Sequence, residues 1–168
     1  MVAPVSIGPI QIVPFTKLVS REDFSCGNEI LDTWLTQFAG QNETRFRSRT
    51  FFAIDQETNQ LLGFYTAVFT ALEAGTQLQG LLTSKYQIPA YLIAKLAVDK
   101  RAQNQGVGKL LLGDALNRAA LAAEAGGLEI VVVDAINNEA TSFYGKFGFT
   151  RVDSQSNRMF LYLKFLHD

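Results

Sequence analysis

The sequence predicts an α/β domain built on a mixed β-sheet, and three segments carry this prediction. Two apolar runs, YLIAKLAVD at residues 91–99 and LEIVVVDA at 128–135, are typical of strands that are covered on both faces. Between them, residues 107–125 repeat apolar side chains at helical spacing and end at a pair of glycines. At 168 residues, the chain is expected to form one domain over residues 1–168.

The first half of the chain predicts a strand, a helix and a hairpin. Residues 10–15 form the first strand, and residues 50–55 and 60–72 form an antiparallel hairpin, because aromatic and β-branched side chains flank the turn QETNQ. Residues 26–42 predict an amphipathic helix of about four turns, closed near Gly40. The apolar face of that helix comprises Ile30, Leu31, Trp34, Leu35 and Phe38.

The second half predicts two helices and a last strand. Residues 75–89 are interpreted as a loop with a short helix, and residues 159–165 as the final strand. The segment NNEATSFYGKFG predicts a short helix, capped by Asn137 or Asn138 and closed by Gly148. In the long helix, the predicted buried face comprises Val107, Leu110, Leu111, Ala115, Ala119 and Ala122.

Composition excludes several classes of protein. The net charge of −1 does not favour a strongly basic nucleic-acid binder. No signal peptide is evident, and no apolar run approaches the ~18–20 residues that span a bilayer. The single cysteine, Cys26, is expected to be a small buried residue and agrees with a reducing cytoplasm. The single histidine, His167, lies next to the C-terminus and argues against a Ser-His-Asp triad or a multi-histidine metal site.

The loop QNQGVG at residues 103–108 has the features of an anion site. Glycines at positions 106 and 108 remove Cβ atoms that would keep a ligand away from the backbone. A helix begins here, so its first amides are unpaired and its dipole is positive at this end. Lys109 and Arg101 add positive charge. From the loop alone, a tight turn without a ligand is equally compatible.

Two well-known phosphate loops do not match this segment. A P-loop needs glycine where Gln103 stands, and serine or threonine where Leu110 stands. The dinucleotide fingerprint needs a third glycine at the position of Leu111.

The loop at residues 103–108 and a later segment at residues 137–149, taken together, resemble two motifs of the GCN5-related N-acetyltransferases, or GNAT family. The family's cofactor loop Q/R-x-x-G-x-G/A is matched by Gln103, Gly106 and Gly108. Its later motif N-x-x-A-x-x-F/L-Y-x-x-x-G-F is matched by Asn137, Ala140, Phe143, Tyr144, Gly148 and Phe149. The resemblance implies the GNAT acyl-CoA N-acyltransferase fold, in which helices cover both faces of a mixed central sheet and a splayed strand pair holds acetyl-CoA.

The resemblance extends to one branch of the family and covers about residues 15–165. Three further segments carry it: FSCGNEILDTWL, LLGFYTA and IPAYLIAKLAVD. That branch comprises toxin acetyltransferases encoded beside ribbon-helix-helix antitoxins, which acetylate aminoacyl-tRNA. The resemblance therefore implies a cytoplasmic enzyme, a homodimer, a ribbon-helix-helix antitoxin partner and a tRNA substrate. Asn104 departs from the branch, which usually has glycine there, and Lys95 stands where arginine is frequent.

The resemblance also implies which residues hold acetyl-CoA. The pyrophosphate would lie on the amides of Gln105, Gly106, Val107, Gly108 and Lys109. Pantetheine would pair with the backbone of Leu96 and Val98 like an added strand, with the Val98 amide facing the thioester oxygen. The remaining implied contacts are Ala97, Gln103, Asn104, Asn137, Ala140, Phe143 and Tyr144.

Tyr144 is the candidate general acid, because family tyrosines at this position point at the sulfur. A phenol with a pKa near 10 is protonated at neutral pH and can give its proton to the departing thiolate. A core tyrosine on an amphipathic helix is the alternative interpretation. No general base stands out; Glu43, Asp99 and Asp134 are candidates by residue type alone.

The segment NETRFRSRT places Arg45, Arg47 and Arg49 at alternate positions. If the segment is extended, all three project from one face and form a contact line for RNA phosphates. A solvated edge without a ligand is the alternative.

Two further functions are compatible with the sequence. The acceptor could be a small amine or a protein N-terminus, because a fold does not fix its substrate. A non-catalytic regulator that binds acyl-CoA is the other alternative, which an intact loop and Tyr144 disfavour.

Overall fold

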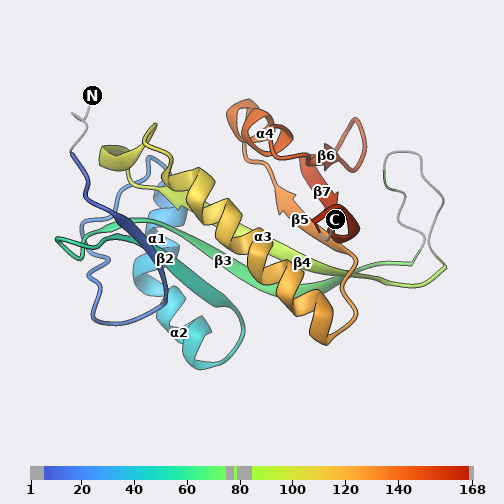
Figure 1. Cartoon of the computed structure of the whole chain (residues 1–168), viewed down its shortest axis with the longest axis horizontal. Coiled ribbons are helices and arrows are strands. Elements are labelled where there is room, and N and C mark those ends of the chain that lie inside the picture. The colour runs from blue at the N-terminus through green and yellow to red at the C-terminus, as the bar shows by residue number, and fades with distance from the viewer. Residues whose placement is uncertain (1–5, 75–77, 79–84, 167–168) are drawn as a thin grey trace. The chain divides into compact units, whose positions relative to one another are not determined.

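The computed structural model of the chain describes residues 6–74, 78 and 85–166. Its strands follow the order β1-β2-β3-β4-β5-β7-β6 in one mixed sheet (Figure 1). The strands are β1 (Ile10–Pro14), β2 (Arg49–Asp55), β3 (Leu61–Leu72), β4 (Ile88–Val98), β5 (Ile130–Asp134), β6 (Thr150–Arg151) and β7 (Arg158–Tyr162). The α-helices are α1 (Glu29–Gln37), α2 (Ala39–Thr44), α3 (Val107–Ala125) and α4 (Asn138–Gly145), and the 3-10 helices are η1 (Lys100–Ala102) and η2 (Leu163–Leu166).

Contacts divide the chain into two compact units. The first comprises Met1–Val68 and Lys95–Ala115, and the second comprises Phe69–Ala94 and Leu116–Asp168. Strands β3 and β4 and helix α3 therefore each contribute one part to either unit. The expectation of one domain over residues 1–168 stays a prediction.

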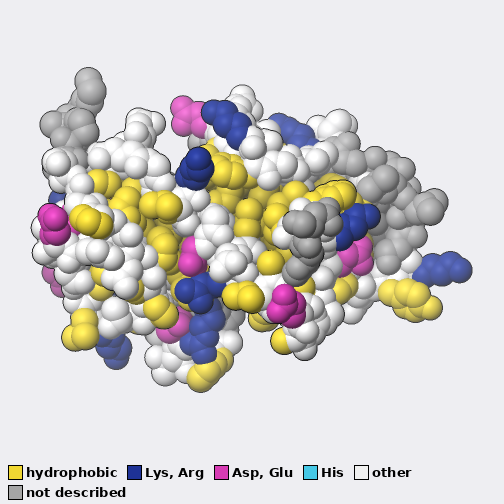
Figure 2. Space-filling model, in the orientation of Figure 1, with side chains coloured by type: hydrophobic (Ala, Val, Ile, Leu, Met, Phe, Trp, Pro, Cys, Tyr) yellow, Lys and Arg dark blue, Asp and Glu magenta, His cyan; other side chains and the backbone are white. Residues whose placement is uncertain are grey.

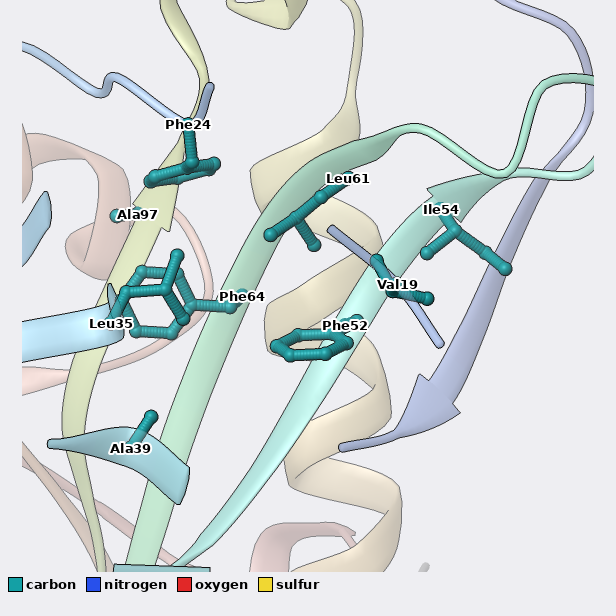
Figure 3. Close-up of a cluster of buried hydrophobic side chains, with 9 residues drawn as sticks. All are labelled: Val19, Phe24, Leu35, Ala39, Phe52, Ile54, Leu61, Phe64 and Ala97. Atoms are coloured by element: carbon teal, nitrogen blue, oxygen red, sulfur yellow. The ribbon is translucent and has the colours of Figure 1, made fainter. Parts of the chain in front are cut away.

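In the first unit, β2 pairs antiparallel with β3, as the predicted hairpin requires, and also antiparallel with β1. Successive residues of β3 face opposite sides of the sheet, one side covered by α1 and the other by α3. Phe64 points toward Leu35 of α1, whereas a Cβ on the preceding Gly63 would touch Val107 and Leu111 of α3. Figure 3 shows the core on the α1 face, formed by Val19, Phe24, Leu35, Ala39, Phe52, Ile54, Leu61, Phe64 and Ala97.

The prediction of a single helix over residues 26–42 is wrong, because the structure has two shorter helices in this segment. Asn28 caps α1 by accepting hydrogen bonds from the amides of Ile30 and Leu31. The helix is interrupted at Phe38, which has a φ of −119°, and α2 then runs through Gly40. Gly40 therefore lies inside a helix and does not close one. Ile30 and Phe38 are exposed, so the buried stripe of α1 is narrower than predicted.

In the second unit, β4 pairs parallel with β5, and β7 pairs antiparallel with β5 and β6. Ile130 and Val132 of β5 are fully buried, as their apolar run predicts. The predicted final strand ends at Tyr162, where η2 begins, and the two-residue strand β6 was not predicted. Residues 75–77 and 79–84, which include most of the predicted loop with a short helix, lie outside the described residues.

Helix α3 ends at Ala125, before the two glycines, as predicted. The buried face differs from the prediction, because Leu110 is 47% exposed, Leu112 is fully buried instead, and Ala122 is only half-buried. Leu110 and Leu112 lie about 100° to either side of the buried Leu111, so spacing alone does not show which border of the face is buried. No helix in the described part of the chain combines the length and apolar composition that crossing a membrane requires.

Candidate active site

The carboxylate of Asp99 organises the loop between β4 and α3. This side chain is 2% exposed and accepts hydrogen bonds from the amides of Ser25 and Arg101, at 3.1 and 2.9 Å. The Arg101 guanidinium adds two hydrogen bonds to the same carboxylate, at 3.0 and 3.2 Å. The Arg101 side chain is 33% exposed and is paired with a buried carboxylate, so the positive charge that the sequence predicts for it is balanced by Asp99.

The same contacts decide the protonation state of Asp99. Burial alone would raise the pKa of this carboxyl, but hydrogen bonds from Arg101 and Ser25 outweigh burial and lower the pKa below its usual range. A carboxylate that is charged, buried and fully hydrogen-bonded is a poor proton acceptor. Asp99 therefore has a structural role and is not a general base.

Gln103 and two residues with positive φ shape the turn that follows. The Gln103 side-chain amide donates to the carbonyls of Val98 and Cys26, at 3.0 and 3.2 Å. Asn104 and Gly106 have φ angles of 63° and 84°. Asparagine is one of the few residues that adopt the left-handed conformation readily, which explains how Asn104 replaces the glycine that is usual in this branch.

The first turn of α3 presents unpaired amides. The Leu110 amide donates to the Gly106 carbonyl at 3.1 Å, which starts the helix. Within the described part of the chain, the amides of Gly106, Val107, Gly108 and Lys109 have no hydrogen-bond acceptor. Together with the positive end of the helix dipole, these amides are available to an anion, and the binding of an anion here stays a prediction.

For the acetyl-CoA that the resemblance implies, a Gly106→Ala variant is expected to raise KM roughly tenfold, the equivalent of about 1.4 kcal/mol, while kcat at saturating cofactor stays near the wild-type value. The new Cβ has no protein atom within 4 Å and projects into open space, and the left-handed backbone strains any residue with a Cβ. Gly113→Ala is the matched control, because its Cβ also meets open space but sits within helix α3. An unchanged KM in Gly106→Ala would contradict the anion site.

Strand β4 leads into this loop. Its pairing with β5 covers Ala90–Ile93, so Leu96 and Val98 lie beyond that ladder. Both side chains are half-buried, whereas the Ala97 side chain is buried in the core of the first unit. At Ala97, the backbone alone is therefore left for the predicted cofactor contact. On the preceding residue, the Lys95 ammonium lies 4.4 Å from the centroid of the Trp34 ring, and burial lowers its pKa.

Gly63 of β3 also shapes the site, although neither sequence motif includes it. A Cβ at this position would lie 2.8 Å from the Ala97 carbonyl oxygen and 3.1 Å from Val107. Glycine thus allows β3 to approach both the end of β4 and the first turn of α3. A lone glycine within the strand pattern LLGFYT was the available signal, because such a glycine often marks close backbone approach.

Helix α4 in the second unit carries the later motif. The Asn137 side chain caps this helix by accepting from the Ala140 amide at 2.8 Å, so Asn137, and not Asn138, is the cap. Gly148 has a φ of 93° just beyond the helix, in agreement with its predicted closing role. Phe143 packs against Phe147, with ring centroids 5.2 Å apart.

Tyr144 is buried within the same motif and is 7% exposed. Its ring lies 5.3 Å from that of Phe143 and 5.6 Å from that of Phe149. Burial, reinforced by the charge of Asp134, raises the pKa of Tyr144 to about 12. Among the described residues, its hydroxyl has no hydrogen-bond partner. The phenol is therefore protonated at physiological pH, and its hydrogen is available to a bound molecule.

The raised pKa of Tyr144 predicts a loss of stability at alkaline pH. The folded state binds this proton more tightly than the unfolded state, whose tyrosines titrate near 10. The resulting stability, a few kcal/mol at most, is present below pH 10 and is lost as the pH rises through about 12. Urea unfolding from pH 8 to 11.5 should show a steeper decline in wild type than in Tyr144→Phe. Parallel declines would contradict the assigned pKa.

The other two candidate bases, Glu43 and Asp134, are each paired with an arginine. Glu43 pairs with Arg49 at 3.0 Å and accepts from the Thr50 amide at 3.0 Å. Asp134 receives two hydrogen bonds from the Arg158 guanidinium, at 2.8 and 3.0 Å. Both carboxylates therefore hold neighbouring structure in place, and neither is poised to accept a substrate proton.

The predicted line of arginines is wrong in its geometry. Arg45 ends helix α2, Phe46 follows with a φ of 57°, and Arg49 begins β2. The segment is not extended, so alternate residues do not project from one face. Cys26 is expected to be buried but is half-buried, and burial, then the nearby Asp32, raises the pKa of its thiol to about 11. The described residues contain no cluster of three or more His, Cys, Asp or Glu that could hold a metal ion.

Comparison with known proteins gives the family. Residues 47–151 match the acetyltransferase (GNAT) domain, and this match covers more than half of the chain. A tRNA-acetylating toxin of Mycobacterium tuberculosis is 34% identical over 128 residues, which cover 75% of either chain. The chain belongs to the GNAT family of acetyltransferases, as the sequence predicts.

Solved structures agree with this assignment. AtaT complexed with acetyl-methionyl-tRNAfMet has a TM-score of 0.83 and 26% identity, over 94% of this chain and 97% of that one. A tyrosine-to-phenylalanine mutant of the AtaT toxin, bound to the C-terminus of the antitoxin AtaR and to acetyl-CoA, has a TM-score of 0.80 and 26% identity. That match covers 94% of this chain and 95% of the other, so the similarity extends well beyond the central motifs.

Proposed function

We propose that this chain transfers the acetyl group of acetyl-CoA to the α-amino group of an aminoacyl-tRNA. The relationship that carries the proposal is the 34% identity, over three quarters of both chains, to a tRNA-acetylating toxin. The AtaT complexes with acetyl-methionyl-tRNAfMet and with acetyl-CoA support the same acceptor and donor.

The loop and β4 supply the cofactor contacts of this proposal. The unpaired amides of Gly106, Val107, Gly108 and Lys109 receive the pyrophosphate, and Gln103 holds the loop against β4. Pantetheine pairs with the backbone of Leu96 and Val98, which lie beyond the ladder between β4 and β5. Asn104, Gln105, Ala97, Asn137, Ala140 and Phe143 complete the proposed contact set by resemblance.

Two groups of the chain act on the reacting atoms. The Val98 amide donates to the thioester oxygen, whose negative charge grows as the amine attacks. A C–N bond then forms and the C–S bond breaks. Tyr144 gives its phenolic proton to the departing sulfur, and water takes the proton that the amine loses.

The pairing of the three candidate bases with arginines agrees with this acceptor. Glu43, Asp99 and Asp134 are each held by an arginine. The α-amine of an aminoacyl ester is weakly basic, so a substantial fraction is neutral near pH 7 and needs no protein base. A strongly basic amine would require a base that these three side chains do not provide.

We also propose a cytoplasmic homodimer that is neutralised by a ribbon-helix-helix antitoxin. The resemblance to the toxin branch supports this proposal, and AtaT is known bound to the C-terminus of its antitoxin. Light scattering of the purified chain, with and without the partner, measures both associations.

The acceptor is tested with matched tRNAs. Purified protein and labelled acetyl-CoA are mixed with a pool of aminoacyl-tRNAs, with the same pool after deacylation, and with a panel of small amines. We expect labelled acetyl on the aminoacyl-tRNAs, and none on the deacylated tRNAs or the small amines. Transfer to small amines but to no tRNA would overturn the proposed acceptor.

A further inference from the structure

The segment Arg45–Arg49, sequence RFRSR, joins α2 to β2 and carries an aromatic side chain in an unusual setting. Phe46 is 79% exposed and has a φ of 57°. Bulky residues rarely adopt this conformation, and backbone strain of this kind concentrates at functional sites. The next buried residue, Ser48, has a side-chain hydroxyl without a hydrogen-bond partner in the described part of the chain. The backbone conformation of Phe46 and the unpaired hydroxyl of Ser48 both cost folding free energy.

One face of the Phe46 ring is covered by a fixed cation. The Arg49 guanidinium lies 4.1 Å from the ring centroid. The same guanidinium is held by the Glu43 carboxylate at 3.0 Å and by the Glu43 carbonyl at 3.3 Å. Because the ring is mostly exposed, its other face is open to a ligand.

The segment is positively charged. Glu43 pairs with Arg49, while Arg45 and Arg47 are exposed and have no ion-pair partner among the described residues. Two unpaired guanidiniums therefore flank the ring in sequence. Figure 2 shows basic side chains beside hydrophobic ones over the region of α2 and the chain that leads into β2.

We propose that the RFRSR segment binds an unpaired nucleotide of the RNA substrate, with Phe46 stacking on the base and Arg45 and Arg47 contacting the adjacent phosphates. This inference rests on the proposed function and identifies the bound part as the single-stranded 3′ end of tRNA. An open aromatic face beside phosphate-binding arginines is the combination that single-stranded nucleic acid requires. An acidic protein segment would use the arginines but would not require a strained, open ring.

Phe46→Gly tests the stacking. Glycine tolerates the positive φ, so the fold is retained while the ring is lost. Affinity for a deacylated tRNA labelled at its 5′ end, measured by fluorescence anisotropy, should fall roughly 5- to 150-fold. Asn59→Gly is the matched control, because Asn59 has a φ of 61° in the same unit and carries no ring. The control should bind as wild type does.

A truncated tRNA locates the contact. For the same tRNA without its unpaired 3′ nucleotides, wild type should bind at least as weakly as Phe46→Gly binds the intact tRNA, because truncation also removes the phosphates assigned to Arg45 and Arg47. Combining the variant with the truncated tRNA should cause little further loss, because both changes remove one interaction. Fully additive losses would overturn the inference.

Arg45→Gln and Arg47→Gln test the phosphate contacts. Each should reduce the slope of log affinity against log salt by about 0.7, since each phosphate contact releases counterions. Lys17→Gln removes one exposed charge elsewhere in the first unit and should leave the slope unchanged. Equal slopes for all three variants and wild type would contradict the assignment.

The binding assay contains no acetyl-CoA, so it separates this inference from the proposed function. Binding that depends on Phe46, without transfer of acetyl to any aminoacyl-tRNA, would uphold the inference and overturn the function. Transfer by wild type, with unchanged affinity in Phe46→Gly, would overturn the inference alone and favour a protein partner for the segment.

Discussion

A Tyr144→Phe variant is expected to lower turnover by about 10²–10⁴ while acetyl-CoA binds with nearly unchanged affinity. The variant keeps the ring that packs against Phe143 and Phe149. It loses a hydroxyl that has no hydrogen-bond partner among the described residues and whose pKa is about 12. The loss therefore affects proton donation to the sulfur more than it affects the fold.

Tyr162→Phe is the matched control for this experiment. Tyr162 is a half-buried tyrosine of the same unit that lies outside the proposed site. Rates should be measured in single-turnover experiments, and acetyl-CoA affinity by calorimetry. Wild-type turnover in Tyr144→Phe would exclude Tyr144 as the general acid.

An Asp99→Ala variant is expected to destabilise the fold by about 1–3 kcal/mol, because the carboxylate is buried while the arginine is partly exposed. The substitution leaves Arg101 without its partner and removes the acceptor of the Ser25 amide. Because the folded pKa of Asp99 is lowered, the stabilisation is present above the unfolded pKa and is lost as the pH falls through the folded value. The difference in free energy of unfolding between wild type and Asp99→Ala should therefore shrink in strong acid.

Asp134→Ala provides the comparison for this prediction. Asp134 also receives two hydrogen bonds from one arginine, but its side chain is 50% exposed. An exposed pair of this kind contributes about 1 kcal/mol or less. Equal losses from the two variants, measured by denaturant unfolding at pH 7, would show that burial of the Asp99 pair is not what stabilises the loop.

Local signals predicted most of the fold. The hairpin of β2 and β3, the buried strand β5, the end of α3 and the cap at Asn137 all agree with the sequence. Each depends on a short-range feature, such as alternation, a run of β-branched residues, a glycine pair or an asparagine before a helix.

Features set by tertiary packing were not predicted. Residues on both sides of Phe38 have helical composition, so the sequence does not mark the break between α1 and α2. Burial of Leu112 in place of Leu110 depends on the sheet that faces α3. The strand β6 has two residues, too few to show a period.

In the site, too, local backbone features were predictable from the sequence and contacts between distant segments were not. Backbone features of the loop, with its glycine at position 106 and its helix start, follow from the sequence. The partners of charged side chains do not, because they depend on contacts between distant segments. Asp99 with Ser25 is one example, and the close approach that Gly63 allows to Ala97 is another.

The central claim is tested most directly by locating the acetyl group on its acceptor. After reaction with acetyl-CoA, charged tRNA is digested with a nuclease, and the terminal aminoacyl-adenosine is analysed by tandem mass spectrometry. We predict an added acetyl on the α-amino group with wild type, and little or none with Tyr144→Phe over the same time. Unmodified aminoacyl-adenosine with wild type, while acetyl-CoA remains bound, would contradict the assignment of aminoacyl-tRNA as the acceptor.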